Sequence, residues 1–278
     1  NELFQKIANE EGYSEGKFKG SMADYFKAQS RGQFMLDFDI VGPVTVSKNA
    51  QYYGQNDADG NDMHAGEMVC EALTKAKSEV SDWQQYDWNN DGYVDQVYIV
   101  YAGQGEADGG EDETIWPHAY DLSSANYYGD GTGPVNVSTS LKVNTYACGS
   151  ELNGNKAIEG IGTICHEFSH CLGYPDFYDV DYSGGQGMDF WDLMDQGSYN
   201  GDGYQPAGYT AYERWTAGWL TPIELDTEDM TVTNMKSLQN GDVLAMAGYP
   251  SYNLTEPFIP TDNELKNKFE SVMRQNHD

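Results

Sequence analysis

Two histidines four residues apart, His166 and His170, are the side chains of this sequence best spaced for chemistry. Residues four apart lie one above the other on the same face of an α-helix, so both imidazoles can reach a single metal ion. Apolar residues recur at steps of three and four along the same segment: Ile161, Ile164, Phe168 and Leu172. This spacing predicts a helix with one face in the core and the opposite face at a metal site.

Two acidic residues complete the predicted site. Glu167 follows the first histidine, about 100° around the helix, so it borders the metal and can take a proton from a metal-activated water. Gly173 is expected to end the helix, because glycine adopts the left-handed conformation readily. Asp176 lies ten residues after His166, where the third ligand of the metzincin zinc peptidases falls, and a carboxylate is an acceptable zinc ligand. The sequence therefore predicts zinc bound by His166, His170 and Asp176, with Glu167 as the general base of a hydrolase.

A second candidate metal site lies in the acidic loop, which we define as residues 87–95. Oxygen-bearing side chains occupy its first, third, fifth and ninth positions, glycine occupies the sixth, and the seventh offers a backbone carbonyl. The candidate calcium ligands are Asp87, Asn89, Asp91, Tyr93 and Asp95. Position twelve is Tyr98 instead of the glutamate of an EF-hand, so we expect a shortened calcium loop that leads into a strand. The alternative is a solvated turn without an ion.

The other histidines and the cysteines have weaker claims to chemistry. His118 follows Trp116 and a proline, and we expect it to be a structural residue and not a ligand. Cys165 and Cys171 flank the histidine pair. Either one disulfide braces this helix, with Cys148 as a candidate partner, or the four cysteines of the chain are free thiols, the fourth being Cys70.

The composition narrows the class of protein. The 278 residues include 15 basic and 45 acidic side chains, which gives a formal charge of -30. This charge argues against nucleic acid or an anionic membrane as a partner. No apolar run reaches the roughly 18 to 20 residues that cross a bilayer. We therefore expect a soluble, exported protein without a membrane span.

Hydrophobic periodicity and turn residues predict an α+β fold. Helices are expected over residues 3–11, 22–28, 63–82 and 206–220, and strands within 33–47, 94–102, 135–138 and 141–146. The fold expected from these elements has a mixed twisted sheet, the long helix 63–82 behind it and the site helix. We expect an N-terminal lobe to about 173 and a smaller C-terminal lobe from about 174, below a cleft. A strand at 243–247 and a helix at 263–273 are expected in a C-terminal extension, 223–278, that follows a catalytic domain of residues 1–222.

The segment from His166 to Asp179 resembles the M6 family of zinc peptidases, the immune inhibitor A-like group, through His-Glu-x-x-His-x-x-Gly-x-Pro-Asp-x-Tyr-Asp. Further blocks that resemble the family lie at 24–34, 86–105, 115–118, 191–201 and 213–222. The resemblance implies a secreted bacterial metalloendopeptidase with a metzincin-like catalytic domain, zinc, structural calcium, and protein or peptide substrates. We expect it to act as a monomer.

Metzincins pass a methionine-bearing turn beneath the zinc, and Met194 is the natural candidate for it. Tyr199, five residues later, is a candidate hydroxyl donor to the reaction intermediate, with plain packing as the alternative.

Two other functions compete with an endopeptidase. The 21 tyrosines, six tryptophans and acidic turns also fit a calcium-stabilised glycan- or protein-binding module without catalysis. A zinc amidase that acts on a non-protein amide would use the same residues as the peptidase. The metal content of the protein distinguishes the binding module from the peptidase. The substrates that are hydrolysed distinguish the amidase from the peptidase.

Overall fold

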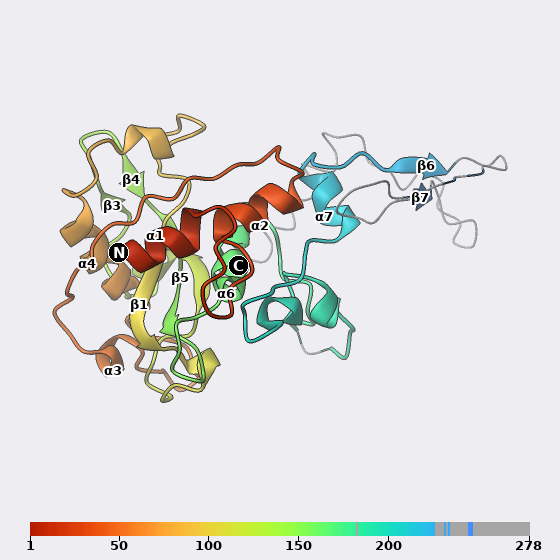
Figure 1. The fold of residues 1–278 in the computed structure, drawn as a ribbon. Helices are drawn as coiled ribbons and strands as arrows, with labels where there is room; N and C mark the ends of the chain where they lie inside the picture. The colour runs from red at the N-terminus through yellow and green to blue at the C-terminus, as the bar shows by residue number, and fades with distance from the viewer. Residues whose placement is uncertain (182, 226–230, 232, 234–243, 247–278) are drawn as a thin grey trace.

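The computed structural model of the chain describes residues 1–181, 183–225, 231, 233 and 244–246 (Figure 1). It is a mixed α+β structure, as predicted. The α-helices are α1 (Glu2–Asn9), α2 (Met22–Gln29), α3 (Ala50–Tyr53), α4 (Ala65–Ala76), α5 (Leu122–Tyr127), α6 (Ile161–Cys171) and α7 (Ala211–Thr216). Short 3-10 helices are η1 (Gln84–Tyr86), η2 (Glu106–Asp108), η3 (Asp189–Trp191) and η4 (Gln196–Tyr199). None of the helices described could span a membrane.

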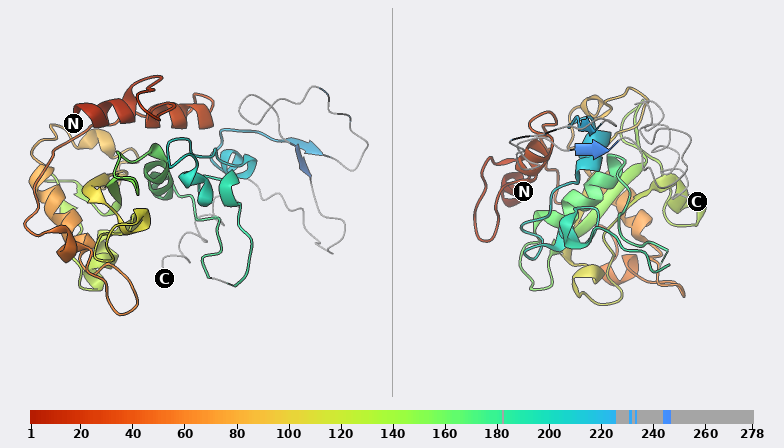
Figure 2. Two further views of the ribbon diagram at one scale, coloured as in Figure 1. Left: turned by 60° about the horizontal axis from the view of Figure 1, so that its bottom comes forward. Right: turned by 90° about the vertical axis from the view of Figure 1, so that its right-hand side faces the viewer.

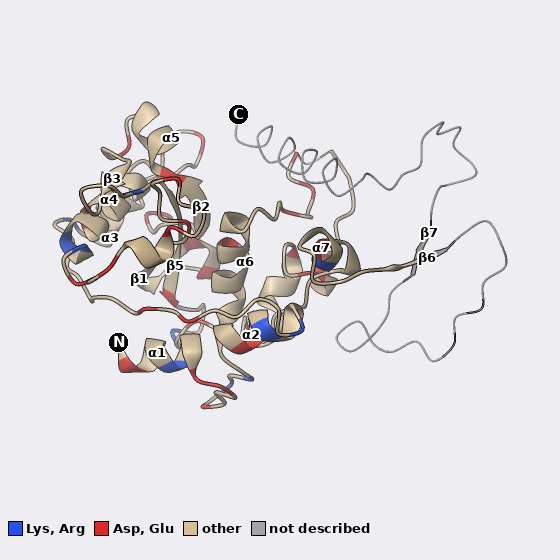
Figure 3. Ribbon diagram, turned by 90° about the horizontal axis from the view of Figure 1, so that it is seen from above, with Lys and Arg blue, Asp and Glu red and all other residues tan. Residues whose placement is uncertain are grey.

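The main sheet has the strand order β1-β5-β2, formed by β1 (Tyr98–Gln104), β5 (Thr145–Leu152) and β2 (His118–Asp121). Strand β1 runs parallel to β5, whereas β2 runs antiparallel to it, so the sheet is mixed. Two smaller pairs are β3 (Val135–Asn136) with β4 (Lys142–Val143), and β6 (Ile223–Leu225) with β7 (Leu244–Met246). Helix α6 lies between the main sheet and α7 (Figures 1 and 3).

Two hydrophobic clusters form the core. The first joins α1 and α2, which follow one another along one side of the molecule (Figure 2), to α6 and to residues after position 174. Phe26 of α2, Phe168 of α6 and Tyr209 near α7 all belong to it. The second cluster packs α4 against the sheet and the β3–β4 pair, for example through Val69 and Tyr146. The first cluster therefore holds the site helix in place from the side opposite the sheet.

The strands predicted within 33–47 are wrong: this segment forms no strand. Its alternation is nevertheless real, because Phe34, Leu36, Phe38 and Ile40 are partly buried against the first cluster. The side chain of Asn9 accepts a hydrogen bond from the Phe38 amide at 2.7 Å and donates one to its carbonyl at 2.8 Å. Apolar residues at every second position indicate an extended chain with one packed face. They do not establish that a neighbouring strand is paired with it.

Several predicted elements form with different bounds. Helix α4 is shorter than 63–82, since the chain turns after Lys77, whose carbonyl accepts the Trp83 indole N–H at 3.0 Å. Helix α7 covers only part of 206–220: it begins after a capping box at Thr210 and ends before Gly218, which has a φ of 75°. The predicted strand 94–102 begins late, at Tyr98. The C-terminal strand forms as β7, and the predicted helix 263–273 lies outside the described residues.

Candidate metal centre

Helix α6 carries the site and is packed as its sequence pattern predicts. Ile161, Ile164 and Phe168 are buried in the first hydrophobic cluster. The start of the helix approaches η4 very closely, because a Cβ atom placed on Gly162 would lie 1.9 Å from the carbonyl oxygen of Ser198. Only glycine fits at this position. The helix is thus fixed from two sides, by apolar packing and by backbone contact with the segment that follows the predicted ligands.

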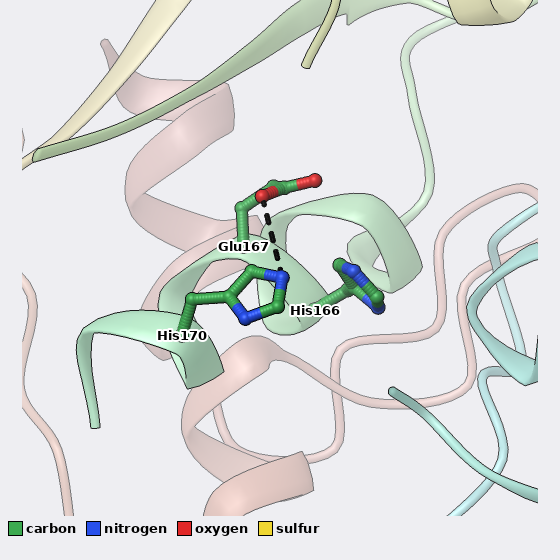
Figure 4. Close-up of side chains that lie close together, drawn as sticks. All are labelled: His166, Glu167 and His170. Atoms are coloured by element: carbon green, nitrogen blue, oxygen red, sulfur yellow. Dashed lines mark ion pairs between the residues drawn. The ribbon is translucent and has the colours of Figure 1, made fainter. Parts of the chain in front are cut away.

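The structure brings all four predicted site residues together. Ligand atoms of His166, Glu167 and His170 lie within 4.8 Å of one another (Figure 4). Asp176 joins them after Gly173, whose φ of 98° lets the chain turn back at the end of the helix. The Oδ1 atom of Asp176 is 3.2 Å from Nε2 of His166 and 3.3 Å from Nε2 of His170. We call His166, His170 and Asp176 the ligand cluster.

Two backbone carbonyls orient the imidazoles. Nδ1 of His166 lies 2.8 Å from the Leu193 carbonyl oxygen, and Nδ1 of His170 lies 2.8 Å from that of Tyr174. A carbonyl can only accept, so each Nδ1 carries a hydrogen, and in a neutral imidazole Nε2 then presents a lone pair. Both Nε2 atoms face Oδ1 of Asp176.

Sequence reasoning missed these orienting groups. Each zinc-bound histidine is expected to donate its other N–H to a carboxylate or a backbone carbonyl, and Asp179, Asp181 and Asp189 are available carboxylates that the sequence does not rank. The structure uses backbone carbonyls instead. Every residue has a carbonyl, so no side-chain signal could have identified Leu193 or Tyr174.

The ligand cluster fits a cation, and zinc in particular. Oδ1 of Asp176 is buried and faces two imidazole nitrogens, so it needs either a proton on one of them or a cation between them. Two imidazole nitrogens and one carboxylate oxygen are ordinary zinc ligands, and bonds of about 2.0–2.1 Å in a tetrahedral site place ligand atoms about 3.3 Å apart. The distances of 3.2 and 3.3 Å from Asp176 to the two histidines agree with this value.

The electrostatics of the cluster follow from burial and close opposite charges. Burial lowers the pKa of His166, but the hydrogen bond to Asp176 and the charges of Glu167 and Asp176 outweigh it and raise this pKa to about 9. Burial raises the pKa of Asp176, but the two histidines hold it well below its usual range. The pKa of Glu167 is raised because the side chain is buried, against the opposing effect of His166 and His170. A carboxylate with a raised pKa is a better proton acceptor near neutral pH.

The turn at residues 192–195 packs beside the ligand cluster. It supplies the Leu193 carbonyl, and the Met194 carbonyl accepts the amide of Phe177, the residue after Asp176, at 2.8 Å. Met194 itself is fully buried in the first cluster. Tyr199 is 44% exposed, and its pKa is raised by burial and by the charge of Glu167. This chain segment therefore links the first histidine to the third predicted ligand.

The other candidate residues lie in different surroundings. Nδ1 of His118 is 2.7 Å from the Trp116 carbonyl oxygen and Nε2 is 2.9 Å from the Tyr146 hydroxyl, so both nitrogens of this partly buried ring have structural partners. The four cysteines are free, so of the two alternatives the structure contains thiols and not a disulfide.

The acidic loop satisfies many of its own oxygen atoms. The carboxylate of Asp87 accepts the amides of Asp91 and Gly92 at 3.0 and 3.1 Å, and that of Asp95 accepts the Trp88 amide at 2.6 Å. Gly92, at the sixth position of the loop, has a φ of 90°. The loop thus has the sharp turn that a calcium loop needs, and its carboxylates are held by backbone amides.

Two histidines and a carboxylate around one buried position, with a glutamate beside them, form the kind of site found in metallohydrolases. The chain belongs to the peptidase M6 family: the model described as "Immune inhibitor A peptidase M6, catalytic domain" matches residues 1–220. This is a family of metallopeptidases, which implies hydrolytic chemistry and a metal, and it confirms the resemblance seen in the sequence.

Individual relatives agree with this assignment. The chain is 31% identical over 230 residues to the pre-pro-metalloprotease PrtV of Vibrio cholerae serotype O1. This alignment covers 72% of the chain and 23% of the relative. It is 29% identical over 239 residues to immune inhibitor A of Bacillus thuringiensis subsp. alesti, covering 74% and 34%. A protein of Arthroderma benhamiae named "Putative secreted metallopeptidase" is 25% identical over 209 residues, covering 66% and 30%. The chain thus spans about a quarter to a third of the length of these relatives.

Proposed function

We propose that this chain is a zinc-dependent endopeptidase domain that hydrolyses peptide bonds in protein substrates. The observation that carries the proposal is the buried Oδ1 atom of Asp176, which faces the Nε2 atoms of His166 and His170 at 3.2 and 3.3 Å, so that three potential ligand atoms converge on one position. Zinc held by these three residues would supply Lewis-acid polarisation of the scissile carbonyl and lower the pKa of a coordinated water.

Glu167 acts as the general base in this proposal. Its side chain is buried, its Oε2 atom lies 4.0 Å from Nε2 of His170 (Figure 4), and its pKa is raised mainly by burial. It accepts a proton from the attacking water and later delivers that proton to the leaving amine. Tyr199 shares the surroundings of Glu167, and its hydroxyl is the candidate donor to the developing oxyanion.

Further parts of the proposal rest on the sequence and the relatives. We propose that the acidic loop binds a structural calcium ion through Asp87, Asn89, Asp91, Asp95 and the Tyr93 carbonyl. The name of the Arthroderma relative and the acidic composition support a secreted protein. Protein or peptide substrates and a monomeric state complete the proposal.

Glu167→Gln tests the mechanism when zinc content and casein cleavage are measured together. We expect one zinc per chain in the wild type and the variant, with cleavage reduced about 10²–10⁴-fold in the variant alone, since only a proton acceptor is lost. Glu10→Gln, which removes a charge from an exposed residue just after α1, is the control and should cleave as the wild type does.

The other outcomes separate the competing functions. A wild type without zinc would contradict the peptidase and favour a calcium-stabilised binding module. Stoichiometric zinc with hydrolysis of a non-protein amide, and none of casein, would favour the zinc amidase.

A further inference from the structure

Two buried carboxyl groups outside the ligand cluster have no assigned role. Asp192 and Glu213 are 0% and 1% exposed, and they come from the turn beside the cluster and from helix α7. One oxygen of each is already engaged. Oδ1 of Asp192 accepts the Met194 amide at 2.8 Å, and Oε2 of Glu213 accepts the Thr210 amide at 2.6 Å and its hydroxyl at 2.8 Å.

The other oxygen of each carboxyl group lacks a hydrogen-bond donor. Oδ2 of Asp192 and Oε1 of Glu213 are buried and receive no hydrogen bond from any other described residue. The two side chains are within hydrogen-bonding contact of each other. Two carboxylates cannot donate, so the contact requires a proton on one of them. Burial and the nearby charge of Asp192 raise the pKa of Glu213 to about 9, so the pair keeps one proton at neutral pH.

The charge of the neighbouring Arg214 favours a single proton on the pair of Asp192 and Glu213. Arg214 follows Glu213 on α7, where Figure 3 shows acidic and basic stretches next to each other, and it is 1% exposed. Its guanidinium donates to the Tyr209 carbonyl at 3.1 Å and to Oε1 of Gln29 at 2.6 Å. A pair that keeps one proton carries a single negative charge, which balances this buried cation. A divalent cation between the carboxylates would instead leave a net positive charge in the interior.

The pair is connected to the first histidine by consecutive contacts. Asp192 holds the Met194 amide, and the residue between them, Leu193, presents the carbonyl that accepts Nδ1–H of His166. Glu213 is fixed in turn by the capping box of α7. Movement of Asp192 would therefore move the carbonyl that orients the imidazole.

We propose that Glu213 is a positioning residue for His166, and that it acts by sharing a proton with Asp192 and so fixing the turn that carries the Leu193 carbonyl. This inference rests on the proposed zinc site. It goes beyond that site by assigning a role to a residue of α7 that touches neither the ligand cluster's metal position nor the substrate.

Amide substitutions test the shared proton directly. In Glu213→Gln, one oxygen must still accept from Thr210, so the amide NH₂ faces the Asp192 carboxylate and replaces the proton. In Asp192→Asn, one oxygen must still accept from Met194, so the NH₂ faces the Glu213 carboxylate. In the double variant two NH₂ groups face each other and no acceptor remains between them. Each single variant should therefore be tolerated, and the double variant should be far worse than their sum.

We would measure zinc affinity by chelator competition and the visible spectrum of the cobalt(II)-substituted protein, which reports ligand geometry. Each single variant should keep its affinity within about threefold of the wild type. The double variant should lose about 10–100-fold, as is typical when a partner that orients a metal ligand is removed, with an altered cobalt spectrum. The infrared difference spectrum, wild type minus Glu213→Gln, should contain the band of a protonated carboxyl at neutral pH.

Val69→Ala is the control for loss of stability alone, because Val69 is buried in the second cluster. It should lower the melting temperature and leave zinc affinity and the cobalt spectrum unchanged. Additive losses in the single and double variants, or a difference spectrum without the protonated-carboxyl band, would overturn the proposal. So would bound calcium that either single variant releases. If the wild type binds no zinc, the proposed function fails, whereas infrared spectra and melting temperatures still decide whether the proton is shared.

Discussion

The ligand cluster and the acidic loop are both candidate metal sites, but they differ in what their atoms already bind. In the ligand cluster, Asp176 aims a buried oxygen at two imidazole nitrogens, and these three atoms need a proton or a cation between them. In the acidic loop, the carboxylates of Asp87 and Asp95 accept backbone amides of the same loop. The first arrangement is unfavourable without a cation or added protons, whereas the second is already stable as a turn.

This difference shows which features identify a metal site. Aspartate and asparagine at calcium-loop spacing also occur in turns that bind no ion. In both kinds of loop their side chains accept hydrogen bonds from backbone amides. Two imidazole nitrogens and a carboxylate oxygen that converge on one position are satisfied only by protons or by a metal ion. We therefore expect metal binding to dominate the properties of the ligand cluster and to make a smaller contribution at the loop.

The largest effect is expected from Asp176→Asn. The amide removes the charge and half of the acceptor capacity from the position that faces both histidines, so zinc affinity should fall by about a thousandfold or more, beyond the 10–100-fold typical of outer-shell partners. The measurement is zinc competition with a chromogenic chelator. Asp91→Asn, the same change in the acidic loop, is the matched control and should leave zinc affinity unchanged. Equal losses in both variants would remove the distinction between the two sites.

The second effect concerns pH in the zinc-free protein. The folded-state pKa of His166 is raised to about 9 from an ordinary value near 6.5. Its protonated form, paired with Asp176, contributes stability that is fully present below about pH 6.5 and is lost as pH rises through about 9. The contribution is about 3 kcal/mol, and zinc affinity should rise over the same interval because the metal must displace that proton.

Urea unfolding between pH 6 and 9.5 tests this prediction, with calcium supplied and a zinc-selective chelator present. Other groups titrate in the same interval, among them Glu159, whose pKa burial raises to about 8. The comparison with Asp176→Asn isolates the histidine, since this variant keeps Glu159 and loses the partner of His166. An identical slope of stability against pH in the two proteins would contradict the prediction.

The local part of the site could be predicted from sequence because helical geometry fixes it. Once α6 forms, His166 and His170 must share a face, and Gly173 lets the chain return with Asp176. The orienting Leu193 and Tyr174 carbonyls could not be predicted, since backbone groups carry no residue signature. The contact between Asp192 and Glu213 was equally hidden, because it joins residues 21 positions apart whose burial only the packed structure reveals.

For the fold too, the sequence predicted the elements that depend on local spacing and missed those that depend on distant contacts. Periodicity correctly identified α1, α2, α4 and α6, which are determined by local spacing. It failed for residues 33–47, where an extended chain packs its alternate side chains on the first cluster and Asn9 replaces a neighbouring strand. Pairing depends on which segment lies alongside, and that is a property of the whole chain.

The smallest effect is expected at the acidic loop, where calcium should stabilise the protein by about 1–2 kcal/mol. This value follows from a dissociation constant of about 10⁻⁴–10⁻³ M, typical of extracellular modules, at about 5 mM calcium. The measurement is the melting temperature with and without calcium, at saturating zinc. Asp95→Asn should abolish the increment, because it removes a charged ligand and keeps an acceptor for the Trp88 amide.

Asp95→Asn also distinguishes a calcium site from a solvated turn, because at a calcium site its effect on the melting temperature should change sign when calcium is added. The pKa of Asp95 is raised by burial and by the charges of Asp91 and Asp87, so the carboxylates of the loop repel each other when no cation is present. Without calcium, Asp95→Asn should therefore match or slightly exceed the wild type in melting temperature, whereas with calcium it should fall below it. A wild-type melting temperature that calcium leaves unchanged would mean that the acidic loop is a turn held by its own amides, and the ligand cluster would then be the one metal site supported among the described residues.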